Sequence, residues 1–375
     1  MIAEAFQSNF TDRGELGASI SVWRDEEEVV SLHAGFADRE KTRPWNEDSI
    51  TVVWSVTKGL SAACVLLALH EAGRDLDEPV ASIWPELAGP SFQQLLTHQA
   101  GLAALDSRAK MDDHEAVVAA LEAQSKSPNW PVGEHHGYHA RTFGFLVDEL
   151  VRRLTGAADL GEFWRTRIAE PLGLDFWIGL PKSEDHRFAE LLPGKTRPNN
   201  ELSEFYTAFS DTGTLTRRAF VSPRGLHAVS EMNKPENHRL CLPAMGGIGS
   251  ARSIAKFYAM MANGGAWRGE RILPERVCDQ AQQLLVTGHD RILLTDTAFA
   301  AGFMKDPIDE SGAKLRQLFG PSTRAFGHPG AGGSLAFADP ENGIAFAYVM
   351  NQMEMSLLPT EKALGLVRAV YQDFV

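Results

Sequence analysis

The sequence predicts an α+β fold, an α/β sandwich in which helices flank an antiparallel sheet and a mainly helical lobe is inserted. Strand-like text occurs at both ends of the 375-residue chain, whereas the middle holds helix fragments and loops rich in proline, glycine and asparagine. Strands from the two ends bury their apolar faces most simply by sharing one sheet. We therefore expect a sheet domain from residues 1–75 and 226–375, a helical lobe at 76–225, and an active site in the cleft between them.

The strand signals lie near the two termini. The alternating run GASISVW, a charged turn at residues 24–28 and the returning run VVSLHAGF predict a hairpin over residues 17–36. Near the C-terminus, TRAFGHPG, GSLAFAD and IAFAYVMNQM predict consecutive strands. A final helix is expected from about residue 360 to residue 374.

Helices are predicted between these strand regions. The run that begins at Ser55 is apolar almost all round, which favours a buried central helix with its N-terminus facing the cleft. RTFGFLVDELVRRLTG carries a one-sided apolar pattern, and Gly156 suits the position just after a helix end. SARSIAKFYAMMANGG predicts a further helix that ends in glycines.

Composition argues against several classes of partner. The net charge of −13 leaves no basic excess for nucleic acid or an anionic membrane surface. The N-terminal text lacks a secretory signal, and no apolar run reaches the ~18 residues of a membrane span. Three cysteines without CxxC spacing indicate reduced, mostly buried thiols. We therefore expect a cytoplasmic protein that acts on a small molecule, with its oligomeric state left open.

Ser55 and Lys58 are the first candidates for chemistry, because residues three apart share one helix face. A free lysine has a pKa near ~10.4, but burial and the positive helix end both favour the neutral amine. Such an amine could be the base for a Ser55 nucleophile, whose unpaired backbone N–H could stabilise an oxyanion. A capping serine with a snorkelling lysine is the alternative. Only this pair opens a long apolar helix, although the S-x-x-K spacing recurs at Ser107/Lys110, Ser253/Lys256 and Ser311/Lys314.

Two further segments carry candidate residues. PVGEHHGYHARTFGFL places Tyr138 just before a helix, where nearby positive groups could lower its pKa and let it shuttle protons. A buried aromatic with a bonded hydroxyl is the alternative. FGHPGAGGSLAFADP places His328 and Gly330 at a strand edge, where glycine permits close approach of a ligand or merely a tight turn.

Together, the three segments resemble the serine β-lactamase and penicillin-binding-protein superfamily. More closely, they resemble the β-lactamase-like (family VIII) carboxylesterases, which are related in pattern to class C β-lactamases and D-alanyl-D-alanine carboxypeptidases. The motifs are S-V-T-K at 55–58, the tyrosine at 138, and His-Pro-Gly at 328–330, where relatives carry Lys-Thr-Gly, His-Thr-Gly or Trp-Gly-Gly. QQLLTHQAGL, GGIGSARSIAKFYAMMANGG and GHPGAGGSLAFADPENGIAFAYVMN also match, so the resemblance spans nearly the whole chain.

The resemblance implies an acyl-enzyme mechanism without cofactor or metal. It implies that Ser55 is the nucleophile and that Lys58 and Tyr138 form the base and proton relay, with the base assignment open between them. It also implies an oxyanion hole from the amides of Ser55 and Ala331. His328 and Gly330 would lie beside the substrate.

Two departures from the family pattern favour neutral esters over β-lactams. Relatives that cleave β-lactams well have asparagine two residues after the tyrosine, where this chain has Ala140. The Lys-Thr pair that holds a β-lactam carboxylate becomes a mostly neutral His328 and Pro329, which has no N–H to donate. We therefore predict a carboxylesterase, with an amidase, D-amino-acid peptidase or weak β-lactamase as the alternative. Acyl-pocket size is expected to depend on loops at residues 107–129 and 180–211.

Two more distant hypotheses remain open. His135, His136 and His139 could bind zinc if helical, but HEXXH is absent and Gly137 weakens a helix there. A non-catalytic binding protein of the same fold is the other, although the combination of Ser55, Lys58 and Tyr138 argues against it.

Overall fold

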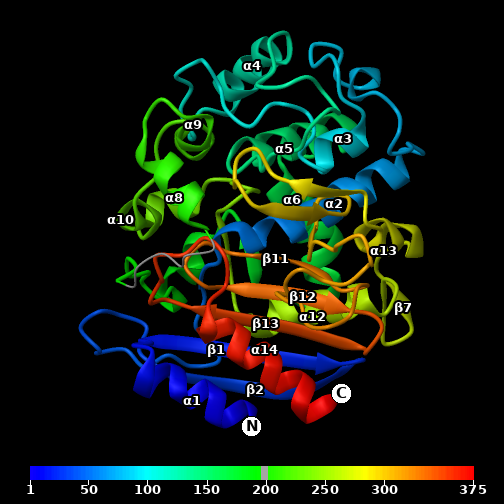
Figure 1. Ribbon diagram of the computed structural model, residues 1–375. Coiled ribbons are helices and arrows are strands. Elements are labelled where there is room, and N and C mark those ends of the chain that lie inside the picture. The colour runs from blue at the N-terminus through cyan, green and yellow to red at the C-terminus, as the bar shows by residue number, and fades with distance from the viewer. Residues whose placement is uncertain (196–201) are drawn as a thin grey trace.

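A computed structural model describes residues 1–195 and 202–375 and contains one large antiparallel sheet (Figure 1). Its strand order is β2-β1-β13-β12-β11-β10-β9-β8, so the N-terminal hairpin joins the C-terminal strands as the sequence predicts. β1 pairs with β13 from Ala18 opposite Met350 to Arg24 opposite Ile344. The strands are β1 Gly17–Arg24, β2 Glu27–Gly35, β8 Val286–His289, β9 Asp296–Phe299, β10 Met304–Lys305, β11 Phe326–Pro329, β12 Leu335–Asp339 and β13 Ile344–Met350.

Helices cover both faces of this sheet, which gives the predicted sandwich. On one face lie α1 (Ile2–Asp12) and α14 (Glu361–Phe374), next to each other at the bottom of Figure 1. On the other face lie α2 (Thr57–Glu71) and α12 (Ala251–Ala262). Alternation along β13 explains the division, because successive side chains of a strand point to opposite faces. Ala345 and Ala347 pack toward α12, whereas Phe346 and Tyr348 pack toward α1 and α14.

The residues between the sheet segments are mainly helical and form the upper part of the molecule in Figure 1. α5 (Thr142–Thr155) is followed directly by Gly156, whose φ of 74° is left-handed, as the sequence predicts. Residues 196–201 lie outside the described part of the chain. The helices of this part are α3 Phe92–Leu96, α4 His114–Ser125, α5 Thr142–Thr155, α6 Leu160–Trp164, α7 Glu170–Leu172, α8 Ser203–Ser210, α9 Leu215–Val221, α10 Val229–Met232 and α11 Pro235–His238, with α13 Glu275–Gln282 after α12.

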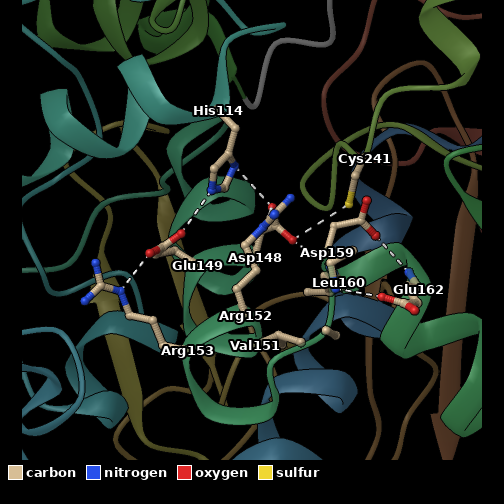
Figure 2. Close-up of polar contacts among 12 residues, drawn as sticks. His114, Asp148, Glu149, Val151, Arg152, Arg153, Asp159, Leu160, Glu162 and Cys241 are labelled. Carbon is tan, nitrogen blue, oxygen red and sulfur yellow. Dashed lines mark hydrogen bonds and ion pairs between the residues drawn. The ribbon is translucent and has the colours of Figure 1, made fainter.

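A partly buried polar network joins α5 to its neighbours (Figure 2). His114 of α4 lies between Asp148 and Glu149 of α5, at 3.2 and 3.0 Å. Asp148 also accepts hydrogen bonds from Arg152 at 3.0 Å and from the Leu160 amide at 2.6 Å, at the start of α6. Because α5 begins four residues after Tyr138, this network anchors the helix that follows a candidate site residue.

A second, three-stranded sheet connects distant parts of the chain beside the central helix α2. Its order is β3-β5-β4, with β3 at Thr51–Val52, β4 at Phe176–Ile178 and β5 at Gly247–Gly249. β4 lies in the expected helical lobe and its partner β5 in the expected sheet domain, so this sheet connects the two. The division at 75/76 and 225/226 stays a prediction. The third sheet among the described residues has two strands, β6 (Ala266–Trp267) and β7 (Glu270–Arg271).

Cys64, Cys241 and Cys278 are unpaired thiols, two of them buried, as expected. Within residues 1–195 and 202–375, every helix is too short or too polar to cross a lipid bilayer.

Candidate active site

Ser55 lies in a strained turn at the head of the central helix. It occupies a 3-10 turn at Trp54–Val56, and α2 begins only at Thr57, so the prediction that Ser55 opens the helix is off by one short turn. Trp54 has a φ of 48°, a left-handed conformation uncommon for a bulky residue. The Thr57 hydroxyl donates to the Trp54 carbonyl at 2.5 Å and accepts from the Gly247 amide at 2.9 Å. Strand β5 therefore holds the turn that presents Ser55.

Lys58 is completely buried, and its amine has three polar neighbours. Nζ lies 3.2 Å from Ser55 Oγ and donates to the carbonyls of Ala140 at 2.9 Å and Ala244 at 2.8 Å. Carbonyls only accept, so they use both N–H bonds of a neutral amine and leave its lone pair for the Ser55 O–H. Burial, and secondarily the charge of Arg141, holds the pKa of Lys58 well below its ordinary value.

Tyr138 completes a group of three side chains around Ser55. Its phenol is hydrogen-bonded to the Ser55 side chain, and Lys58 Nζ lies 4.7 Å from the centre of its ring. Burial raises the pKa of Tyr138, and this effect outweighs the lowering by the hydrogen bond with Ser55. The expected lowering of this pKa is therefore wrong, because the cation invoked for it is a desolvated amine that favours its neutral form. At neutral pH the group is a protonated phenol.

Asp290 positions the Tyr138 loop, and the sequence analysis did not identify it. The Tyr138 amide donates to both oxygens of this fully buried carboxylate, at 3.1 Å each. Asp290 also accepts from the amides of Ile292 and Leu293 at 2.8 Å and from the Thr297 hydroxyl at 3.1 Å. An aspartate that caps its own following amides is a local turn signal. The contact between Asp290 and Tyr138 joins residues 152 positions apart, and no local sequence pattern predicts it.

Buried histidines pack around the same loop as neutral rings. His139 donates from Nδ1 to the Gly137 carbonyl at 2.7 Å, and its Nε2 accepts from the Leu102 amide at 2.9 Å. Burial lowers the pKa of His139 to about 4. Both of its ring nitrogens are thus engaged within the protein, which removes it from the hypothetical zinc site. In the described part of the chain, no three His, Cys, Asp or Glu side chains gather in a metal-binding arrangement.

Residues of the His-Pro-Gly segment line the same cavity as Ser55. His328 is in β11, buried, and its Nδ1 is bonded to the Pro329 carbonyl at 2.7 Å. An added Cβ at Gly330 would come within 2.3 Å of the Val53 carbonyl, so glycine allows this loop to reach the Ser55 turn. Neither the Ser55 amide nor the Ala331 amide donates to another described residue. Ser55 and Ala331 line the same cavity, so two residues with an unpaired N–H lie beside it, as an oxyanion hole requires.

The cavity beside Ser55 is narrow and mostly apolar. Its volume of about 10 Å³ is near the minimum that one water molecule needs. None of its lining residues comes from the described parts of 107–129 or 180–211, where the sequence analysis sought the acyl pocket; residues 196–201 lie outside the description. The lining consists of Ser55, Tyr138, Leu293, Met304, His328, Pro329, Ala331, Leu357 and Leu358.

Known proteins of similar sequence and structure are hydrolases and penicillin-binding-protein homologues. The esterase/β-lactamase LipL of Mycobacterium tuberculosis is 31% identical over 96% of this chain and 83% of its own length. A solved family VIII carboxylesterase superposes with a TM-score of 0.86 at 32% identity, covering 99% of this chain and 96% of the other. A penicillin-binding-protein homologue from Caulobacter crescentus superposes with a TM-score of 0.85 at 33% identity and the same coverage.

Fold and comparisons together define the class of protein: a serine hydrolase of β-lactamase fold. The family described as Beta-lactamase matches residues 2–367, and the chain belongs to that family.

Proposed function

We propose that this protein is a carboxylesterase that cleaves small neutral esters through an acyl-enzyme on Ser55. The observation that carries the proposal is the hydrogen bonding of Lys58. Its amine donates to two carbonyls and meets the Ser55 hydroxyl at 3.2 Å, so a neutral base and a nucleophile are already in contact. Reaction geometry of this kind is the main requirement of nucleophilic catalysis.

The proton positions support distinct roles for Lys58 and Tyr138. Ser55 Oγ attacks the ester carbonyl while its proton passes to Lys58 Nζ, and the amides of Ser55 and Ala331 receive the oxyanion. When the tetrahedral intermediate collapses, the C–O bond to the alcohol breaks. The leaving alkoxide takes a proton from the Tyr138 phenol, and the Lys58 ammonium then gives the proton it took from Ser55 to the phenolate. A water molecule repeats the attack on the acyl-enzyme and releases the carboxylic acid. In this scheme Lys58 is the base, and Tyr138 is the proton donor.

The groups around the cavity support an ester rather than a β-lactam substrate. His328 and Pro329 supply no cation and no hydroxyl for a carboxylate, and the Ala140 side chain cannot bind an amide. A charge-assisted hydrogen bond contributes about 1.5–3 kcal/mol, so a carboxylate that lacks two of them binds poorly. Two similar proteins are described as an esterase/β-lactamase and a family VIII carboxylesterase; both names include ester hydrolysis, and the first includes β-lactam hydrolysis as well. Amidase, D-amino-acid peptidase and weak β-lactamase activities are the alternative outcomes of the test.

The test compares p-nitrophenyl acetate and butyrate with nitrocefin and a D-amino-acid p-nitroanilide. We expect kcat/KM for the esters to exceed that for the other two substrates clearly. Ser55→Ala should abolish turnover, and Lys58→Met should lower kcat by about 10²–10⁴-fold. Ser107→Ala, at an exposed serine with the same S-x-x-K spacing, is the matched control and should change nothing. Faster lactam turnover would refute the substrate class, and retained turnover in Ser55→Ala would refute the nucleophile.

A second readout separates a catalytic protein from a binding protein of the same fold. Intact-mass analysis after treatment with a fluorophosphonate should give one adduct, absent from Ser55→Ala. An unmodified protein that also turns over no ester would favour the binding protein. We also propose a cytoplasmic location, supported by the three unpaired cysteines, which cell fractionation with an antibody can test.

A further inference from the structure

The orientation of the His328 ring determines which hydrogen-bonding role it can offer a ligand. Its Nδ1 lies 2.7 Å from the Pro329 carbonyl, and a carbonyl can only accept, so Nδ1 carries a proton. Nε2, at the other side of the ring, is buried and has no hydrogen-bond partner among the described residues. In a neutral ring that nitrogen bears the lone pair. Burial lowers the pKa of His328 to about 3, so the ring is neutral throughout the working pH range.

Among the described residues, no group that lines the cavity donates to this nitrogen, and the free Ala331 amide is assigned to the oxyanion. Leu293, Met304, Leu357 and Leu358 are apolar, and Pro329 has no N–H. The remaining polar side chains of the lining, Ser55 and Tyr138, are hydrogen-bonded to each other. A substrate that displaces solvent from the cavity must therefore supply a donor to His328 or leave a buried acceptor unpaired, which is unfavourable.

We propose that His328 Nε2 is a specificity determinant that accepts a hydrogen bond from a hydroxyl group of the substrate, so that the preferred esters are hydroxylated ones. This inference rests on the proposed esterase function. It differs from the role of a lysine in the same place, because a lysine attracts carboxylates, whereas a bare imidazole nitrogen repels them. The inference therefore orders three classes of ester: hydroxylated first, purely apolar second, and those with a free carboxylate last.

Matched ester pairs test this order, with acid release followed in a pH-stat. 2-Hydroxyethyl butyrate is compared with propyl butyrate, and ethyl 3-hydroxybutyrate with ethyl 3-methylbutyrate, so that a hydroxyl replaces a methyl on the alcohol or the acyl side. We expect kcat/KM to favour the hydroxylated member by about tenfold in at least one pair. Monoethyl succinate should be the poorest substrate. A ratio at or below one in both pairs would overturn the proposal.

Variants at position 328 attribute the preference to this side chain. His328→Leu removes the acceptor, and the favoured ratio should fall from about ten to about one. His328→Gln keeps an acceptor oxygen at similar reach and should restore much of the ratio. Because each ratio compares two substrates on one variant, general loss of folded enzyme cancels. A ratio that persists in His328→Leu would place the determinant elsewhere and overturn the assignment.

The protonation of the ring can be measured without turnover. In protein labelled with ¹⁵N-histidine, two-bond ¹H–¹⁵N spectra should show the Nδ1-protonated form of His328, identified by its absence from His328→Leu. A proton on Nε2 would overturn the proposal even if esters are cleaved. If the spectra show bare Nε2 but no ester of either pair is hydrolysed, the esterase function fails. The proposed preference for hydroxylated esters is then refuted as well, because the protein cleaves neither kind of ester.

Discussion

Replacing Asp290 by asparagine should weaken both the fold and catalysis, because one buried carboxylate holds the Tyr138 loop. Its Oδ1 accepts three amides, from Tyr138, Ile292 and Leu293, and its Oδ2 accepts the Tyr138 amide and the Thr297 hydroxyl. Asparagine keeps one acceptor oxygen for the three amides. The asparagine NH2 group takes the place of Oδ2, so it faces the Tyr138 amide donor to donor. The Thr297 hydroxyl can rotate and accept a hydrogen bond from the NH2 group.

The cost follows from the strength of these bonds. Hydrogen bonds to a charged group contribute about 1.5–3 kcal/mol and neutral ones about 0.5–1.5 kcal/mol. Three amide bonds that become neutral therefore lose roughly 1 kcal/mol each, about 3 kcal/mol in total. Asp290→Ala would leave these donors unsatisfied at about 1–3 kcal/mol each, a sum comparable to the total stability of a domain. Asparagine is accordingly the more informative variant.

The assay combines urea unfolding with ester kinetics. For Asp290→Asn we expect the free energy of unfolding to fall by about 3 kcal/mol and kcat for p-nitrophenyl butyrate to fall about 10–100-fold, because the phenol is displaced from Ser55. Asp296→Asn is the matched control, since Asp296 is exposed, and it should stay within about 0.5 kcal/mol. Unchanged stability would refute the bond count. Lost stability with unchanged kcat in the folded fraction would show that Asp290 does not position Tyr138.

Two further predictions concern pH. Arg141 is buried, bonds to the carbonyls of Phe220 and Gly225, and its charge helps to lower the pKa of Lys58. Arg141→Met should therefore raise the pKa of Lys58 and move the acidic limb of the kcat/KM profile to higher pH. Arg141→Lys keeps the charge and should leave the profile unchanged. Coincident pH profiles of Arg141→Met and the wild type would contradict this prediction. His139 has a pKa lowered from 6.5 to about 4, so below pH 6.5 the unfolded state binds a proton that the folded state refuses. Its contribution, about 3 kcal/mol, is lost as the pH falls from 6.5 to 4, and His139→Gln should flatten the urea stability profile by about 1.4 kcal/mol per pH unit there. A variant profile parallel to that of the wild type would refute this assignment.

Local patterns in the sequence accounted for the elements and for part of the site. Alternating side chains predicted the hairpin at residues 17–36, because a strand with two different faces needs a period of two. A serine three residues before a lysine, at the head of an apolar run, predicted the contact between Ser55 and Lys58. The short strands β8, β9 and β10 were not predicted, since two to four residues carry too little periodicity to be recognised.

By itself, the sequence determined which residue types could be nucleophile and base, since their spacing along one turn is a local property. Only the tertiary structure decided their protonation. The carbonyls that orient the amine belong to Ala140 and Ala244, which are 82 and 186 residues from Lys58. Burial raised the pKa of Tyr138 where charge alone suggested a decrease. Desolvation and hydrogen bonds to distant backbone groups depend on which segments contact each other in the folded protein. The spacing of residues along the sequence does not specify those contacts.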